Sequence, residues 1–309
     1  MSIKSIFGKF YQYNTVIIFI LMLAVSGFIT ENFFSPNNIS NLIRQSAPIG
    51  LISMGMLLVI LTGGIDLSVG SVVAMIGVCF SLLSYEVYFP VAFGLSLLVG
   101  LGMGAVSGYL VAYRKIASFI VTLAMMSMIR GAGYLLSKGA PVSVGPHSAD
   151  ILTLGSGSLL GVPVSAIIVV IVFAILYLLL SYNVFGRIIL AIGSNEEAVR
   201  LSGIAVKRSK FAVYTICTLL TALAAMLMVG RTGVGTPNIG VGLELDAIAA
   251  VVIGGASLAG GKGSLLNTLL GVFILSMISN VMNLLDITSY LQQIIKGVII
   301  IVAVLFQRN

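Results

Sequence analysis

Long apolar segments, separated by short polar ones, follow one another along almost the whole chain. A helix needs about twenty apolar residues to cross the hydrocarbon layer of a membrane. We expect such helices at 14–31, 45–62, 69–85, 90–112, 118–137, 164–182, 211–230, 243–257, 264–284 and 289–306. Because the runs are continuous and not alternating, they favour helices over the strands of a membrane β-barrel. The pattern predicts an all-α integral membrane protein with about ten transmembrane helices, folded as one domain over residues 1–309.

Lysine and arginine are unevenly divided between the two sides of this predicted bundle. Cytoplasmic loops of membrane proteins are enriched in these residues. With the N-terminus in the cytoplasm, eleven fall inside and three outside, the three being Arg44, Lys138 and Arg231. The eleven are Lys4, Lys9, Arg114, Lys115, Arg187, Arg200, Lys207, Arg208, Lys210, Lys262 and Arg308. We therefore expect both termini in the cytoplasm and attribute the net charge of +7 to membrane orientation, not to nucleic-acid binding.

The composition agrees with a membrane protein and argues against several kinds of site. Apolar residues make up 59% of the chain and charged residues 8%, against roughly 25% charged residues in a soluble domain. His147 is the single histidine, which leaves little material for a metal site or a histidine-based catalytic centre. Gly261 and Lys262 look like part of a phosphate-binding loop, but that motif requires glycine at position 256 and serine or threonine at position 263. This chain has Ala256 and Gly263 there, so the motif is absent. We expect no cofactor, no metal and no enzymatic activity on this chain.

The longest polar segment, residues 183–210, lies between two apolar stretches and holds seven of the 25 charged residues. Ser194 or Asn195 is placed to cap a short helix with two glutamates in its first turn. Arg200 follows the first of these glutamates at i+4, and Gly203 would end the helix. Two interpretations remain: a surface helix through which a soluble partner acts on the membrane domain, or a solvated loop.

Two glycine-rich segments, 62–71 and 254–264, interrupt the apolar pattern. Glycine permits sharp turns and close backbone contacts. The segments are either tight turns between antiparallel helices or breaks within helices, which at membrane depth survive only inside protein or beside water. Ten spans also permit two halves of five helices in opposite orientation, an inverted repeat. The two glycine-rich segments occupy non-equivalent positions in such halves and do not support the repeat.

Four polar residues near the predicted spans are candidates for lining a substrate pathway: Asp66, Ser68, Asn280 and Asn283. An ionisable group within a membrane is expensive and marks a functional site. Asp66 lies two residues before Ser68, so it also has the position of a residue that caps the next helix. Asn280 and Asn283 share a helix face and would either bridge helices or line an aqueous path.

Residues 138–163 form the longest connection on the predicted external side. Its prolines and glycines indicate a loop, with room for one short surface helix. The loop is either a docking surface for an external partner or a simple connector.

Four motifs carry a resemblance to a known family: GGIDLSVGS (63–71), AIGSNEEAVRLSGI (191–204), GLELDAIAAVVIGGASLAGGKGS (242–264) and NLLDITSYLQQIIKG (283–297). From about residue 33 onward the chain resembles the permeases of bacterial ABC importers for simple sugars, and most closely those for ribose. The resemblance implies a second copy of the permease, a cytoplasmic ATPase and a periplasmic or lipid-anchored sugar-binding protein as partners. It also implies that the ATPase is coupled through Gly193, Ser194, Asn195, Glu196, Glu197, Ala198, Arg200, Leu201 and Gly203.

These observations predict the inner-membrane permease subunit of an ATP-driven importer of a ribose-like monosaccharide, working by alternating access. The alternative is an ion-coupled secondary transporter of a small neutral solute. Such a transporter would need paired acidic groups or a proton relay at the centre of the membrane. Eight of the nine acidic residues lie near the external membrane boundary or in the cytoplasm, which leaves Asp66 alone as a candidate within the membrane. The sequence therefore favours the importer.

Overall fold

The computed structural model describes residues 14–146 and 149–307, and over these ranges the fold is almost entirely helical. Four residues from the predictions above, Lys4, Lys9, His147 and Arg308, lie outside the described ranges. The helices are α2 (Asn14–Ile29), α3 (Pro36–Leu61), α4 (Val69–Glu86), α5 (Phe89–Ala112), α6 (Ser118–Ser137), α7 (Ala149–Ser156), α8 (Val164–Ser181), α9 (Val184–Leu201), α10 (Val206–Thr232), α11 (Leu243–Ile253), α12 (Leu265–Leu284) and α13 (Ser289–Gln307).

Each of the ten expected spans coincides with a helix, and seven helices in the described ranges are long and apolar enough to cross a membrane. The seven are α3, α4, α5, α6, α8, α10 and α12. The helices α2 and α11, with 16 and 11 residues, are shorter. The prediction of an all-helical, multi-pass membrane protein is confirmed at this level.

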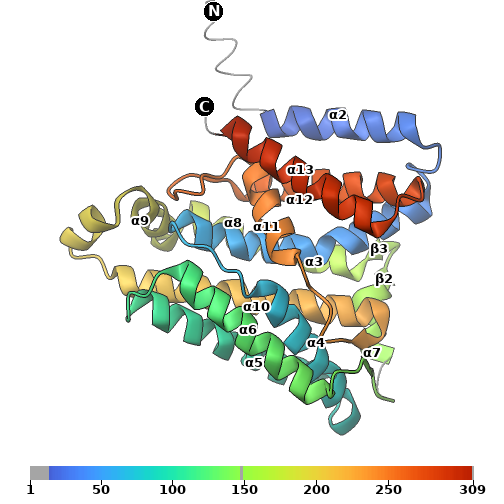
Figure 1. The fold of residues 1–309 in the computed structure, drawn as a ribbon, viewed down its shortest axis with the longest axis horizontal. Helices are drawn as coiled ribbons and strands as arrows, with labels where there is room; N and C mark the ends of the chain where they lie inside the picture. Colours follow the sequence, from blue (N-terminus) through green and yellow to red (C-terminus); the bar gives the residue numbers. More distant parts are fainter. Residues whose placement is uncertain (1–13, 147–148, 308–309) are drawn as a thin grey trace, which may run out of the picture.

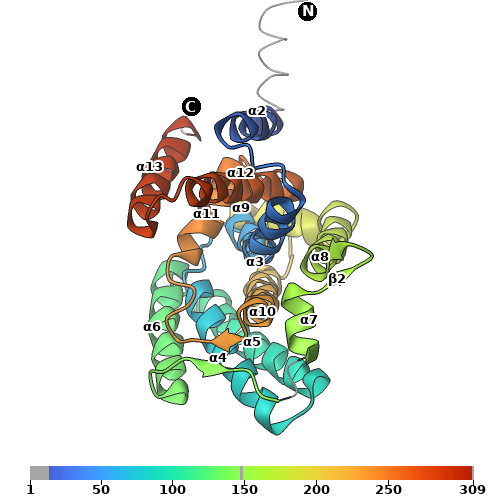
Figure 2. The same cartoon turned by 90° about the vertical axis from the view of Figure 1, so that its right-hand side faces the viewer.

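The centre of the bundle is the pair α3 and α10, which pack directly on one another (Figures 1 and 2). They hold 26 and 27 residues, so each is about 40 Å long. Gly55 permits the close contact, because a Cβ there would lie 2.9 Å from the Cα of Cys217. Cys217 is fully buried in the main core, and most of α3 beyond Ala47 is buried with it.

Local signals explain where α3 begins and ends. The Ser35 side chain accepts a hydrogen bond from the backbone N–H of Asn38 at 3.3 Å, and Pro36 occupies the first turn, where its missing N–H costs nothing. The helix ends at Leu61, before Gly63 with φ +75°. The expected span 45–62 was therefore too short, because the first turns of α3 are polar.

The opposite ends of the bundle differ in what they carry. One end carries α9, and we call it the α9 end; the other carries α7 and four two-residue strands, and we call it the α7 end (Figure 1). The strands pair antiparallel as β1 (Val142–Ser143) with β4 (Val234–Gly235) and β2 (Ser158–Leu159) with β3 (Val162–Pro163).

The connection 138–163 is packed against α10 and is more than a flexible linker. It contains the one short helix that was expected, α7. Ile151 is fully buried in the main core. A Cβ on Gly155 would lie 2.2 Å from the backbone carbon of Gly230, so α7 and α10 touch along their backbones.

The two glycine-rich segments turn out to have different structures. In 254–264 the backbone folds back on itself, since the N–H of Ser257 donates to the carbonyl of Lys262 at 2.9 Å. Residues 62–68, in contrast, run from the α9 end into the bundle and lead to the start of α4 (Figure 1). The hydroxyl groups of Ser118 and Thr122 contact the N–H and carbonyl of Ile65 at 3.4 and 3.3 Å. Side chains thus replace the backbone partners that a helix would supply.

Candidate functional site

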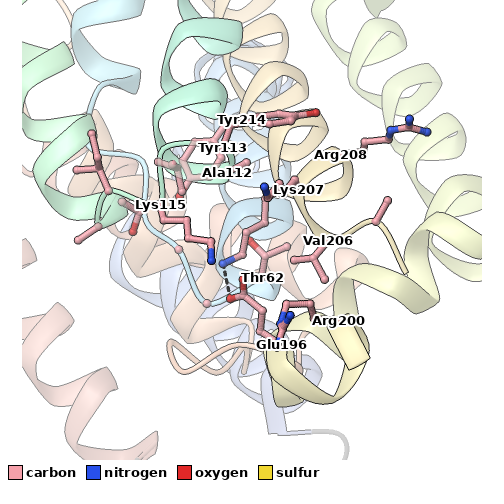
Figure 3. A pocket seen from close by; sticks show the side chains of 18 of the residues that line it. Thr62, Ala112, Tyr113, Lys115, Glu196, Arg200, Val206, Lys207, Arg208 and Tyr214 are labelled. Atoms are coloured by element: carbon pink, nitrogen blue, oxygen red, sulfur yellow. Dashed lines mark hydrogen bonds and ion pairs between the residues drawn. The ribbon is translucent and has the colours of Figure 1, made fainter. Parts of the chain in front are cut away.

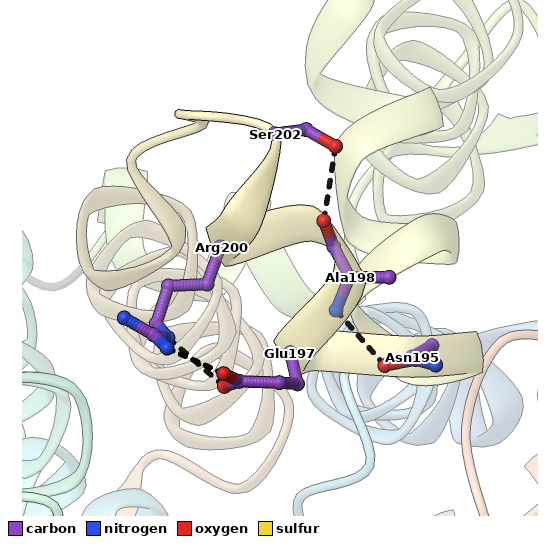
Figure 4. A network of polar contacts seen from close by, with 5 residues as sticks. All are labelled: Asn195, Glu197, Ala198, Arg200 and Ser202. Carbon is purple, nitrogen blue, oxygen red and sulfur yellow. Dashed lines mark hydrogen bonds and ion pairs between the residues drawn. The ribbon is translucent and has the colours of Figure 1, made fainter.

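The α9 tip, residues 194–203, projects from the α9 end with every residue exposed except Val199 (Figures 1 and 4). Asn195 has non-helical angles (φ −160°, ψ 93°), and they divide α9 into two helices. Its side-chain oxygen accepts a hydrogen bond from the N–H of Ala198 at 3.0 Å, which satisfies one of the free donors at a helix start. Gly203, with φ +78°, ends the second helix, and its N–H donates to the carbonyl of Arg200 at 3.1 Å. The capping by Asn195 and the stop at Gly203 were both predicted.

The ion pairs of the α9 tip differ from the expected one. Arg200 pairs with Glu197 through two hydrogen bonds, of which the one from Nε measures 2.9 Å (Figure 4). Glu196, which was expected to pair with Arg200, instead binds Lys210 of α10. Arg200 is occupied by its two hydrogen bonds to Glu197 at i−3, and Lys210 offers Glu196 a cation from α10. Hydrogen bonding to Arg200 lowers the pKa of Glu197, and the same bonds raise the pKa of Arg200, so both stay charged at neutral pH.

The α9 tip is fixed to the bundle at two places. Val199 packs with Ile192 and Val206 in a small apolar cluster separate from the main core. At Gly193 the backbone of α9 touches the end of α3 and the turn 254–264, because a Cβ there would lie 2.0 Å from the carbonyl oxygen of Leu61 and 2.2 Å from the N–H nitrogen of Gly261. The N–H of Gly261 also donates to that Leu61 carbonyl at 3.0 Å. Movement of the tip would therefore reach α3 directly.

A cavity of about 1000 Å³ lies between the α9 tip, the first turns of α10 and the α5–α6 connection. Figure 3 shows Lys115 and Glu196 on facing walls, with Arg208 directed away from them. The Lys207 ammonium lies 6.0 Å from the centre of the Tyr113 ring. Its lining carries more basic than acidic side chains among apolar ones, and it belongs to the same face as the tip.

The four pathway candidates are not brought together. Asp66 and Ser68 are fully buried, and one Asp66 oxygen accepts hydrogen bonds from the N–H and the hydroxyl of Ser68 at 2.9 and 2.6 Å. Both residues lie next to the start of α4, but the N-cap position is Ser68 and no side chain caps the helix, so Asp66 orders the turn before α4 and does not cap it. Asn280 exchanges two amide hydrogen bonds with Asn38, at 3.0 and 2.8 Å, and so bridges α12 to α3.

Asn283 occupies a different environment, on the wall of a second cavity of about 300 Å³ at the α7 end. Its side-chain oxygen accepts a hydrogen bond from Gln292 at 2.8 Å. The sequence analysis missed Ser276 and Ser279 on the same wall, although together with Asn283 they recur at helical spacing along α12. This periodic polar stripe in an apolar helix was the available signal.

Two basic side chains within the apolar helices, those of Lys296 and Arg130, have partners within the fold. The Lys296 ammonium lies 3.1 Å from a carboxylate oxygen of Asp246. The Arg130 guanidinium donates to the carbonyls of Pro237 and Ile239 at 2.8 and 2.7 Å. Both partners are distant in sequence, so a rule based on position within a helix could not identify them.

The family model described as "Branched-chain amino acid transport system / permease component" matches residues 38–304. The chain belongs to this family of transport permeases. The permease is 42% identical to the ribose import permease of Escherichia coli K12 over 315 residues, which covers 99% of this chain and 98% of that protein. It is also 42% identical to the ribose import permease of Bacillus subtilis (94% and 91% covered) and 36% identical to the xylose transport permease of Escherichia coli K12 (88% and 85% covered). No solved structure matches the permease significantly.

Proposed function

We propose that this permease forms the membrane pathway of an ATP-driven importer for a ribose-like monosaccharide, as one domain over residues 1–309. The observation that carries the proposal is the 42% identity to ribose import permeases over nearly the whole of both chains. The family description names branched-chain amino acids, but relatives similar over nearly their full length are named for ribose, arabinose and xylose. Membership of this family decides against the ion-coupled secondary transporter.

The α9 tip is the proposed docking element for a cytoplasmic ATPase subunit, which places the α9 end and both chain termini in the cytoplasm. Three features support this role: the tip is exposed, its helix is capped at both ends, and Gly193 joins it to α3. A push on the tip would be passed to the central helix with little loss, because the contact is backbone against backbone. Asp66 and Ser68 would then act as local structure at the α3–α4 break.

The α7 end is the proposed external face, where a sugar-binding protein would deliver its load to a pair of permease copies. We also infer ten membrane spans, arranged as two halves of five in opposite orientation. The breaks after α3 and α10 support this arrangement, since residues 62–68 and 233–242 each follow a central helix and lead to a shorter one. The remaining outer surfaces, rich in exposed leucine and isoleucine, would contact membrane lipid.

A cellular uptake assay tests the importer. Cells that lack their own ribose uptake would receive this permease with its ATPase and sugar-binding protein, and uptake of labelled ribose would be measured. We expect uptake to depend on a catalytically intact ATPase and to persist when an uncoupler collapses the proton gradient. Uptake that survives loss of the ATPase but stops with the uncoupler would overturn the proposal.

A further inference from the structure

The cavity at the α7 end combines polar groups in a way that is unusual for the interior of an apolar bundle. It is lined from five helices, α3, α10, α11, α12 and α13, and its volume of about 300 Å³ is at the lower end for small-molecule sites. Its neutral polar residues are Gln45, Ser276, Ser279, Asn283 and Gln292.

The cavity extends from the end of the bundle toward its middle. Asn283 is one residue from the end of α12 and Gln292 is in the first turn of α13. Ser276 lies eight residues before the end of α12, which is about 12 Å along the helix axis. A solute entering past these two hydrogen-bonded amides would therefore meet Ser276 deep in the bundle.

Several hydrogen-bonding groups on the wall have no partner among the described residues. The hydroxyl of Ser276 is buried and unpaired, although a buried hydroxyl without a partner is costly. Gln292 uses its amide N–H groups on Asn283 and on the Ile287 carbonyl, both at 2.8 Å. The side-chain carbonyl oxygen of Gln292 is left to accept a hydrogen bond, and the side-chain amide nitrogen of Asn283 is left to donate one. A sugar hydroxyl needs both an acceptor and a donor.

The charges in the cavity are mostly compensated. Asp246 and Lys296 face each other at 3.1 Å and neutralise one another, so Arg231 is the single lining cation without an ion pair in the described ranges. The cavity also touches two irregular points of the bundle, Pro48 inside α3 and the start of the short helix α11. Transporters place their substrate sites beside such interrupted helices.

We propose that the α7-end cavity is a monosaccharide subsite in each permease copy, with Ser276, Asn283 and Gln292 contacting sugar hydroxyl groups. This inference rests on the proposed function, because a sugar must first be the transported solute.

The test uses the complete importer in proteoliposomes, with permease, ATPase and sugar-binding protein, and measures labelled ribose transported per ATP hydrolysed at saturating loaded binding protein. The Ser276 hydroxyl has no hydrogen-bond partner in the protein, so Ser276→Ala removes none of the hydrogen bonds that hold the fold together. We expect a fall of roughly three- to tenfold, the effect of one lost hydrogen bond to the solute. Asn283→Asp keeps the oxygen that binds Gln292, loses the donor, and should also reduce transport.

Ser53→Ala is the matched control, because Ser53 is also a buried, unpaired serine but lines neither cavity. It should transport like the wild type. If Ser276→Ala transports as well as Ser53→Ala, the subsite is wrong while the importer stands. If the wild-type complex carries no ribose, xylose or arabinose, the proposed function itself fails.

Cysteine labelling provides a second readout that does not depend on transport rate. Cys79 and Cys217 would be replaced by alanine, and Ser276→Cys would be treated in the same complex with a water-soluble thiol reagent. We expect labelling that slows when ribose and its loaded binding protein are present during turnover. No labelling in any state, or labelling that ribose does not slow, would contradict the subsite.

Discussion

Alanine in place of Gly193 is expected to break the mechanical connection between the α9 tip and α3. The added Cβ would meet the Leu61 carbonyl oxygen at 2.0 Å and the Gly261 nitrogen at 2.2 Å, and both are backbone atoms. Such atoms cannot rotate away as a side chain can, so α9 must move by about 1 Å or more. The tip would then lose its register on the end of α3.

The size of the effect follows from these contacts. Inserting a methyl group into a packed contact costs about 1–3 kcal/mol. Separating Gly261 from Leu61, now joined by a 3.0 Å hydrogen bond, would cost about 0.5–1.5 kcal/mol more. Gly203→Ala has no clash, since no atom lies within 4 Å of its Cβ, and costs about 1–2 kcal/mol for the left-handed backbone alone.

The assay compares the two alanine variants in the reconstituted importer. Gly193→Ala should keep ATPase bound in co-purification, because the exposed surface of the tip is unchanged, but ribose transport per ATP hydrolysed should fall at least tenfold. Gly203→Ala, which alters the end of the tip itself, should weaken ATPase co-purification. Wild-type transport per ATP in Gly193→Ala would refute the direct connection from the tip to α3.

Three further substitutions test the packing of the bundle, each through thermal unfolding in detergent. Asn280→Leu leaves the Asn38 amide without its partner and should lower stability by about 1–3 kcal/mol; no change in the midpoint would contradict the bridge. Lys296→Met leaves Asp246 unpaired and should cost about 1–2 kcal/mol because the pair is partly exposed, with recovery in the double variant that also carries Asp246→Asn. Gly102→Ala, with no atom within 4 Å of its Cβ, should stabilise α5 by up to about 1 kcal/mol, and a loss of stability would show a hidden contact.

The positions of the helices were predictable because they depend on local chemistry. Apolar continuity located all ten expected helices, and a cap and a left-handed glycine located the ends of the α9 tip at Asn195 and Gly203. The first turns of α3 were missed because they are polar, although Ser35 followed by proline is a helix-start signal.

The partners of polar side chains were not predictable, because each depends on residues far away in sequence. Asn280 and Asn283 share one helix face, and the sequence gives no reason to separate them. The structure separates them because Asn280 meets Asn38, 242 positions away, while Asn283 faces a cavity. The ion pair of Lys296 was likewise not predictable, because its partner, Asp246, lies 50 positions earlier on another helix.

The proposed inverted repeat depends on which interruptions are compared. Comparing 62–71 with 254–264 gave it no support, since one joins the second and third expected spans and the other the eighth and ninth. The structure shows 254–264 to be a compact turn, so in the proposed repeat the segment 233–242 would be the counterpart of 62–68. Each has a glycine in the left-handed region within its first two residues, Gly63 at φ +75° and Gly233 at φ +71°.

These two breaks meet inside the bundle. One starts at the α9 end and the other at the α7 end (Figures 1 and 2). A Cβ on Gly70, in the first turn of α4, would lie 2.2 Å from the carbonyl oxygen of Gly240. Because α4 begins at Val69 and α11 at Leu243, the start of the shortened helix α4 lies against the segment that leads into the shortened helix α11. A displacement of α3 by the α9 tip would therefore reach α11, and with it the wall of the α7-end cavity, through contacts between backbones alone.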